Sequence, residues 1–174
     1  STDNPLTLCM LTQLLGEAGV TPGAAQIVTG RGSVVGHELC ANPDVDLVTL
    51  TGLTQVGIET AEVCAKTLTH TALELGGNDA FIVMSDADID LATDELIWGR
   101  MYNTGQVCCA SKRFLVHKDV VDEFTKKAVE KISALKQGDP ADDATQIGCL
   151  ISEHAAKKVE EQVNLTVEQG GKII

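Results

Sequence analysis

The chain has 174 residues, 44% of them apolar and 22% charged, which is ordinary for a globular protein and excludes a disordered one. Its formal net charge of -12 argues against nucleic acid or an anionic membrane as a partner, because either would need clustered Lys and Arg. The sequence contains no apolar stretch long enough to span a bilayer and does not begin with a secretory signal, so we expect a cytoplasmic protein.

The first half of the sequence predicts alternating helices and strands. Leu8, Leu11 and Leu15 follow a helical spacing that indicates the buried stripe of a helix over residues 6–17. The elements predicted next are a strand over 25–29, a helix over 33–41, a strand over 46–51 and a helix over 55–66. This order is typical of a mostly parallel α/β sheet, in which ligands bind beyond the carboxyl ends of the strands.

The second half continues the alternation after a glycine pair. Gly76 and Gly77 separate two short apolar runs, so we expect Glu74 on a strand that ends in a tight turn. The elements predicted are strands over 71–75 and 80–84, a helix over 88–102, a strand over 112–117, and helices over 121–135 and 152–169. We expect a domain boundary that divides the chain into residues 1–73 and 74–174.

The segment Leu50-Thr-Gly-Leu-Thr-Gln-Val-Gly57 indicates a strand, a glycine turn and a helix. Backbone amides at the start of a helix bind phosphate readily, and glycine permits close approach. The alternative is a plain strand-to-helix connection. The spacing differs from the Gly-x-Gly-x-x-Gly fingerprint, and an earlier glycine run, Gly30 to Gly36, is one residue too long for it.

Cys108 and Glu74 are the candidate catalytic residues. Cys108 lies in Asn103-Thr-Gly-Gln-Val-Cys-Cys-Ala110, and Glu74 opens Glu74-Leu-Gly-Gly77. A thiolate is the reactive form of cysteine and needs a nearby donor, helix end or base, while flanking glycines let a substrate come close. Cys109 is displaced by one residue, so we expect it to serve packing. The alternative is a buried pair of cysteines beside an ordinary turn.

The remaining cysteines do not indicate a metal site. The sequence contains no Cys-x-x-Cys pair and its four histidines are scattered, so we expect no metal. Cys9, Cys40 and Cys64 lie in apolar surroundings typical of reduced core thiols, which agrees with a reducing compartment.

Together, the segments around Gly52, Glu74 and Cys108 resemble the aldehyde dehydrogenase superfamily, and the resemblance extends over essentially the whole chain. Their order and spacing are similar to the family's cofactor turn, its Glu-Leu-Gly-Gly general base and its Gly-Gln-x-Cys nucleophile. The resemblance implies an α/β fold: part of a Rossmann-like parallel-sheet domain, followed by part of an α/β catalytic domain. It implies NAD or NADP as the cofactor, held by Gly32, Thr51, Gly52, Leu53, Val56, Gly57, Leu75 and Gly76.

The sequence departs from the family pattern at several positions. Leu50 and Leu53 stand where phenylalanine and serine are usual, so any cofactor hydrogen bond at Leu53 must come from the backbone. Asn78 replaces a common lysine after Glu-Leu-Gly-Gly, and Thr2 lies near where NAD-preferring relatives carry an acidic residue. The choice between NAD and NADP therefore stays open.

The resemblance implies oxidation of a small aldehyde, and the residues from Glu74 to Arg113 look most like the succinate-semialdehyde dehydrogenases. Family members are more than twice this length, so we expect a fragment that is inactive alone, from a parent that is a homodimer or homotetramer. Two other classes remain as alternatives: a cysteine-dependent hydrolase or acyltransferase, and a non-catalytic assembly module.

Overall fold

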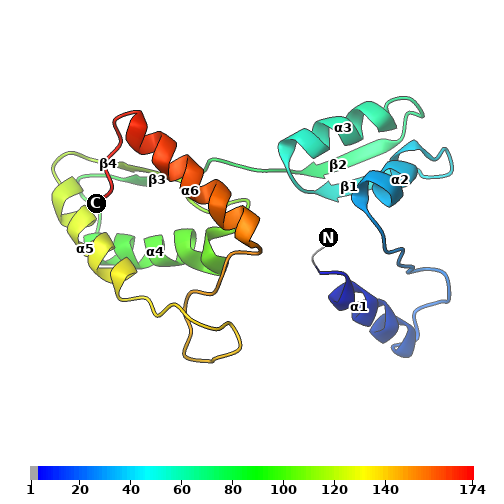
Figure 1. Cartoon of the computed structure of the whole chain (residues 1–174), viewed down its shortest axis with the longest axis horizontal. Coiled ribbons are helices and arrows are strands. Elements are labelled where there is room, and N and C mark those ends of the chain that lie inside the picture. The colour runs from blue at the N-terminus through cyan, green and yellow to red at the C-terminus, as the bar shows by residue number, and fades with distance from the viewer. Residues whose placement is uncertain (1–3) are drawn as a thin grey trace. The chain divides into compact units, whose positions relative to one another are not determined.

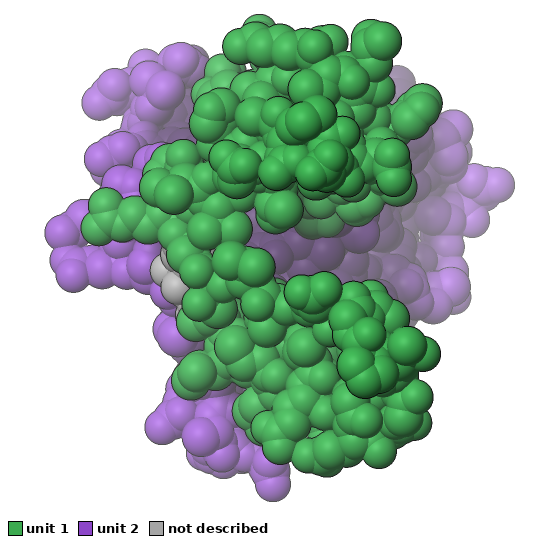
Figure 2. Space-filling model, turned by 90° about the vertical axis from the view of Figure 1, so that its right-hand side faces the viewer, with its two compact units in different colours: residues 1–76 green, residues 77–174 purple. Residues whose placement is uncertain are grey.

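The computed structural model describes residues 4–174. The chain forms two compact units that divide between Gly76 and Gly77, coloured green and purple in Figure 2. Each unit contains two parallel strands joined by a helix, so the α/β class expected from the sequence is confirmed. No helix within residues 4–174 combines the length and the apolar character needed to cross a membrane.

The first unit is built on the parallel strands β1 (Leu47–Thr51) and β2 (His70–Glu74). Helix α3 (Thr54–Cys64) connects them, as neighbouring parallel strands require a crossover. The unit also contains α1 (Pro5–Glu17), a π-helical turn η1 (Gly32–Gly36) and the short helix α2 (His37–Ala41) that continues from it. Figure 1 shows α2 and α3 beside the two strands.

Two predictions for this unit were wrong. Residues 25–29 are not a strand, and Ile27 and Val28 are 36% and 69% exposed. A strand exists only through hydrogen bonds to a neighbour, and within residues 4–174 β1 and β2 pair only with each other. The leucine stripe of α1 is also not buried, since Leu8 and Leu11 are 47% and 50% exposed, because no described element covers this face.

The predicted helix over residues 33–41 forms in two parts, first η1 and then α2. Gly30 allows the backbone before η1 to lie against the side chain of Val35. A Cβ at position 30 would lie 2.5 Å from the Cγ2 of Val35. The helix period alone does not distinguish a π turn from an α turn, so the sequence could not predict this difference.

The second unit pairs β3 (Ala80–Val83) with β4 (Arg113–Val116) in parallel. Helix α4 (Ile89–Met101) and a one-turn 3₁₀ helix η2 (Tyr102–Gly105) lie between them in sequence. Two further helices follow, α5 (Val121–Ser133) and α6 (Glu153–Glu168). The strands and α-helices of this unit agree with the predicted ones to within a few residues at each end, whereas η2 was not predicted.

The hydrophobic core of the second unit lies between its strands, α4 and α5. Its buried residues are Val83, Ile89, Leu96, Phe124 and Ala128. The rings of Phe81 and Phe114 extend this core, with centroids 5.3 Å apart. Burial of such side chains stabilises the unit and fixes the end of α4 from which the Cys108 segment begins.

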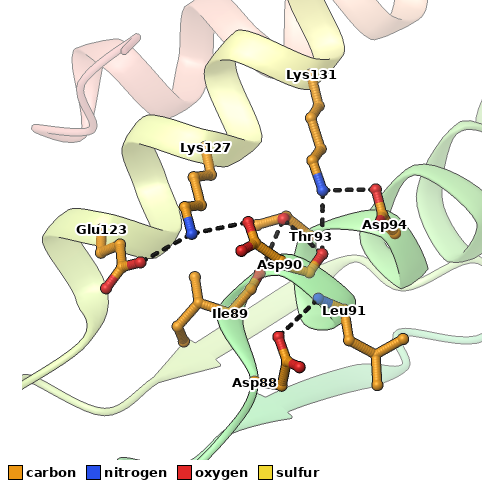
Figure 3. A network of polar contacts seen from close by, with 9 residues as sticks. All are labelled: Asp88, Ile89, Asp90, Leu91, Thr93, Asp94, Glu123, Lys127 and Lys131. Atoms are coloured by element: carbon orange, nitrogen blue, oxygen red, sulfur yellow. Dashed lines mark hydrogen bonds and ion pairs between the residues drawn. The ribbon is translucent and has the colours of Figure 1, made fainter.

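Charged residues join α4 and α5 outside this core (Figure 3). The Nζ of Lys127 lies 2.7 Å from a carboxylate oxygen of Asp90 and 2.9 Å from one of Glu123, and Lys131 pairs with Asp94 at 2.5 Å. Lys127, through its hydrogen bond and then its charge, holds the pKa of Asp90 below its usual value of 3.8. Hydrogen bonds to Asp90 and Glu123 raise the pKa of Lys127 in turn.

Candidate active site

The candidate cofactor turn lies where β1 ends and α3 begins. Leu53 is the N-cap of α3 in an extended conformation, and no side chain caps the first turn of this helix. The amides of the first residues of a helix have no partner inside it, and the helix dipole makes this end positive. The exposed turn from Gly52 to Val56 therefore has the geometry and charge that suit a phosphate group.

The same end of the sheet brings Glu74 to the turn. Thr51 and Glu74 are partners in the β1–β2 register, and the amide of Gly52 donates a hydrogen bond of 2.9 Å to the carbonyl of Glu74. Both strands end at this edge because they run parallel. The candidate base and the candidate cofactor turn are thus adjacent, and the Glu74 side chain is exposed.

Gly57 and Leu75 explain how closely α3 approaches the segment after β2. Gly57 is buried, and a Cβ there would lie 2.6 Å from the Cδ2 of Leu75. Gly76 lies next to the same helix, because a Cβ on it would be 3.9 Å from the Oγ1 of Thr54. Leu75 and Gly76, both expected to bind cofactor, therefore lie at the start of α3.

One predicted cofactor position, Gly32, has no hydrogen bond to this turn among residues 4–174. Gly32 begins η1. Thr2 lies outside the described residues.

Cys108 and Cys109 are the central residues of a turn in the second unit. The amide of Ala110 donates a hydrogen bond of 3.1 Å to the carbonyl of Val107, which closes the turn. Both cysteines are exposed, whereas Ala110 is 4% exposed. The alternative of a buried cysteine pair is therefore wrong for both residues, as is the packing role expected for Cys109, and the thiol of Cys108 is open to a reagent.

The approach to this turn contains an unusual backbone. Asn103 and Thr104 have φ values of 48° and 58°, and Gly105 follows with 74°. Asn and Gly adopt this left-handed region readily, but a β-branched Thr does so at a cost of about 1–3 kcal/mol. Such strain persists where the surroundings enforce it and is frequent at functional sites.

Gln106 holds this segment in place through both ends of its amide. Its Nε2 donates to the carbonyl of Asn103 at 3.2 Å, and its Oε1 accepts from the amide of Ile151 at 2.8 Å. The link to Ile151 joins the segment before the cysteine turn to the loop before α6. No local pattern indicated this link, since it joins residues far apart in the chain.

Sequence reasoning also missed Lys112, which it placed only at the start of a strand. The Lys112 ammonium donates to the carbonyl of Cys108 at 3.0 Å and to that of Ala110 at 2.9 Å. A lysine shortly after a cysteine is too common to have indicated this contact.

Within residues 4–174, no cluster of three or more His, Cys, Asp or Glu could hold a metal ion.

Comparison with known proteins identifies the family. The model of the aldehyde dehydrogenase family matches residues 1–174, and the chain therefore belongs to this family. This membership agrees with the two βαβ units and with the exposed cysteine turn described above.

Two relatives are enzymes named for small aldehydes. The chain is 38% identical over 174 residues to the succinate-semialdehyde dehydrogenase [NADP(+)] GabD of Escherichia coli K12. It is 36% identical over the same length to the D-glyceraldehyde dehydrogenase (NADP(+)) of Picrophilus torridus. In both comparisons all of this chain aligns, but it covers only 36% and 35% of the relative.

Solved structures show the same relationship. A crystal structure of the NAD-dependent aldehyde dehydrogenase from Sinorhizobium meliloti superposes with a TM-score of 0.98 at 35% identity, covering 100% of this chain and 35% of that one. Betaine aldehyde dehydrogenase from Staphylococcus aureus in complex with NAD+ gives a TM-score of 0.95 at 33% identity, covering 99% and 34%. The chain thus spans about a third of the length of the relatives it matches.

Proposed function

We propose that the protein to which this chain belongs oxidises a small aldehyde to a carboxylate with NAD or NADP. The observation that carries the proposal is the exposed thiol of Cys108 on a turn held by backbone hydrogen bonds. Membership in the aldehyde dehydrogenase family and the names of the relatives support the reaction class.

The residues at the start of α3 fit a dinucleotide cofactor. We assign its binding to Thr51, Gly52, Leu53, Val56 and Gly57, with Leu75 and Gly76 beside them. The uncapped amides at the start of this helix suit the pyrophosphate. Since the side chain of Leu53 has no donor, any hydrogen bond from this residue to the cofactor comes from its backbone amide. When bound, the nicotinamide supplies the hydride acceptor of the reaction.

We assign the role of nucleophile to Cys108. Its thiolate adds to the aldehyde carbon, forming a C–S bond and an oxyanion. We assign the backbone amide of Cys108 as a hydrogen-bond donor to that oxyanion, and one such donor contributes on the order of 3 kcal/mol in the transition state. Loss of hydride from the thiohemiacetal carbon then leaves a thioester on Cys108.

We assign the role of general base to Glu74. Its exposed carboxylate removes a proton from water, the resulting hydroxide attacks the thioester carbon, and the C–S bond breaks to release the acid and the Cys108 thiolate. General-base assistance of this kind contributes about 10² to 10⁴ in rate. Because Glu74 ends a strand and precedes two glycines, its position can adjust between the two half-reactions.

Rates of aldehyde oxidation by the natural polypeptide that contains this chain test the proposal. The panel comprises succinate semialdehyde, glyceraldehyde, betaine aldehyde and lactaldehyde, each with NAD and with NADP. We propose succinate semialdehyde as the preferred substrate, since one of the two most similar relatives described above is named for it.

Two variants separate the proposed roles. Cys108→Ser should abolish reduction of the cofactor, and Glu74→Gln should give one stoichiometric burst of reduced cofactor and then stall. Cys109→Ser is the matched control and should keep its turnover. Full turnover in Cys108→Ser would refute the nucleophile, and full turnover in Glu74→Gln would refute the base.

A further inference from the structure

The side chain of Lys112 forms a hydrogen bond to the carbonyl of Cys108. The ammonium group donates to this carbonyl at 3.0 Å and to the carbonyl of Ala110 at 2.9 Å. The two accepting carbonyls belong to the first and the last residue of the segment from Cys108 to Ala110. One cation therefore ties together the whole cysteine turn, which the hydrogen bond from Ala110 to Val107 also closes.

The same carbonyl also lies close to Gly77. A Cβ on Gly77 would lie 3.1 Å from the carbonyl oxygen of Cys108 and 2.7 Å from a carboxylate oxygen of Asp79. These separations leave little space beyond a glycine. The peptide between Cys108 and Cys109 is thus in close contact with both Gly77 and the Lys112 ammonium.

The backbone around Lys112 is held by several hydrogen bonds. The amides of Lys112 and Arg113 both donate to the carbonyl of Asp79, at 3.0 and 3.2 Å, and the Nε of Arg113 donates to the carbonyl of Asn78 at 2.9 Å. The amide of Ser111 donates to the carbonyl of Gly99 at 3.0 Å. The base of the lysine side chain is therefore fixed by contacts to the start of β3 and to α4.

The charge of Lys112 is directed to backbone carbonyls and not to a carboxylate. Four other lysines, Lys127, Lys131, Lys136 and Lys157, pair with Asp or Glu, while among residues 4–174 Lys112 forms no such pair. Hydrogen bonds from a charged donor are stronger than neutral ones. Fixing the peptide after Cys108 fixes ψ of that residue, and with it the direction of the Cα–Cβ bond, from which the thiol extends, relative to the rest of the turn.

We infer that Lys112 is a positioning residue for Cys108, which holds the turn so that the thiol and the backbone amide of Cys108 meet the aldehyde together. The inference rests on the proposed function, in which Cys108 is the nucleophile. It adds a residue that touches neither substrate nor cofactor in that scheme and acts only through the cysteine turn.

The test compares Lys112→Met with Lys112→Arg in the natural polypeptide that contains this chain. Methionine keeps much of the aliphatic length without the charge, whereas arginine keeps the charge and can reach both carbonyls. Lys118→Met is the matched control, because Lys118 is exposed and lies in the turn just after β4. The readouts are kcat, KM for aldehyde and for cofactor, the burst amplitude per chain, and the rate at which iodoacetamide alkylates Cys108.

We expect Lys112→Met to lower kcat and the Cys108 alkylation rate together, by about tenfold, as a small misplacement of a reacting group does. KM for the cofactor and the burst amplitude should not change, and Lys112→Arg should restore most of the rate. Unchanged kcat in Lys112→Met would overturn the inference. A loss of kcat that is matched by an equal loss of burst amplitude would also overturn it. So would a Lys112→Arg variant that is no faster than Lys112→Met.

Cys108→Ser, measured beside these variants, distinguishes two kinds of failure. If Cys108→Ser is inactive while Lys112→Met is fully active, the positioning role fails and the proposed function stands. If Cys108→Ser keeps its turnover, the proposed function itself fails.

Discussion

Leu53 at the N-cap of α3 is an unusual choice for its position. Ser, Thr, Asp and Asn are preferred there because their side-chain oxygen accepts from an amide of the first turn, whereas leucine leaves these amides unpaired. The side chain is also 72% exposed, so its removal costs little packing. The lack of a cap keeps the amides free for the proposed cofactor phosphates.

Leu53→Ser should therefore stabilise the protein without cofactor by about 1 kcal/mol, the usual contribution of an N-cap hydroxyl. Denaturant unfolding in the absence of cofactor measures this change. Leu53→Ala, which removes the side chain without adding an oxygen, is the control. Equal stabilities of the serine and alanine variants would show that the first turn of α3 already has its amides satisfied.

Cys64 differs from the cysteines of the proposed site. It is 1% exposed, and burial, with a smaller effect of the neighbouring Cys40, raises the pKa of its thiol above the usual 9.0. At neutral pH it stays protonated and enclosed. Iodoacetamide should therefore label the exposed Cys108, Cys109 and Cys149 well before Cys64, as peptide mass spectrometry would show.

The raised pKa also has a consequence for stability. Above pH 9.0 the Cys64 thiol ionises in the unfolded chain but not in the folded one, so the unfolded state is favoured as the pH rises. The contribution of this thiol to the free energy of unfolding is complete below that pH. It is lost as the pH rises through the pKa of the thiol in the folded state. Cys64→Ala should weaken this dependence, and an identical pH profile in the variant would contradict the assignment.

At the scale of single residues, the sequence predicted the types of the site residues but not their contacts. The parallel order of β1 and β2 was enough to place Glu74 beside the turn at Gly52. The left-handed backbone at Thr104 could not be predicted, because threonine avoids that region and only its surroundings enforce it. The contacts of Lys112 depend on the exact turn at Cys108, which no periodicity encodes.

At the scale of elements, α4 and α5 are joined by a core and by an exposed ionic contact. Lys127 bridges Asp90 of α4 and Glu123 of its own helix (Figure 3). Exposed ion pairs contribute little individually, because water screens them and the side chains lose freedom. The Phe124 and Leu96 core should therefore dominate this interface.

A double-mutant cycle on Asp90→Asn and Lys127→Met tests that division. We expect each single variant to lower the melting temperature slightly. The double variant should lose less than the sum of the two single losses, because the ion pair is lost only once. Since Lys127 lowers the pKa of Asp90, the contribution is present above pH 3.8 and disappears as the pH falls through the folded pKa. A coupling that persists in strong acid would contradict this account.

Most elements were predictable because their patterns are local. The apolar spacing of α4 and α5 matches buried residues such as Leu96 and Phe124. The strand expected over residues 25–29 failed because pairing depends on a partner elsewhere in the chain, and β-branched composition cannot supply one. Local sequence thus determined helices better than it determined strands.

At the scale of the whole molecule, large apolar faces remain exposed. Val159 and Val163 of α6 are 47% and 42% exposed. The exposed apolar residues of α1 are Leu6, Leu8, Met10, Leu11 and Leu14. No residue of α1 or α6 is buried. The chain spans about a third of its relatives' length, and the apolar pattern of α1 predicts a burial that the described residues do not provide.

The measurement that tests the central claim most directly is the mass of the cysteine peptide after one turnover. Glu74→Gln protein, in the natural polypeptide, is mixed with succinate semialdehyde and NADP, quenched in acid and digested. The account predicts an acyl group, of the mass of the substrate acid less water, on the thiol of Cys108. An unmodified Cys108 after a full burst of reduced cofactor, or an acyl group found only on Cys109 or Cys149, would contradict it.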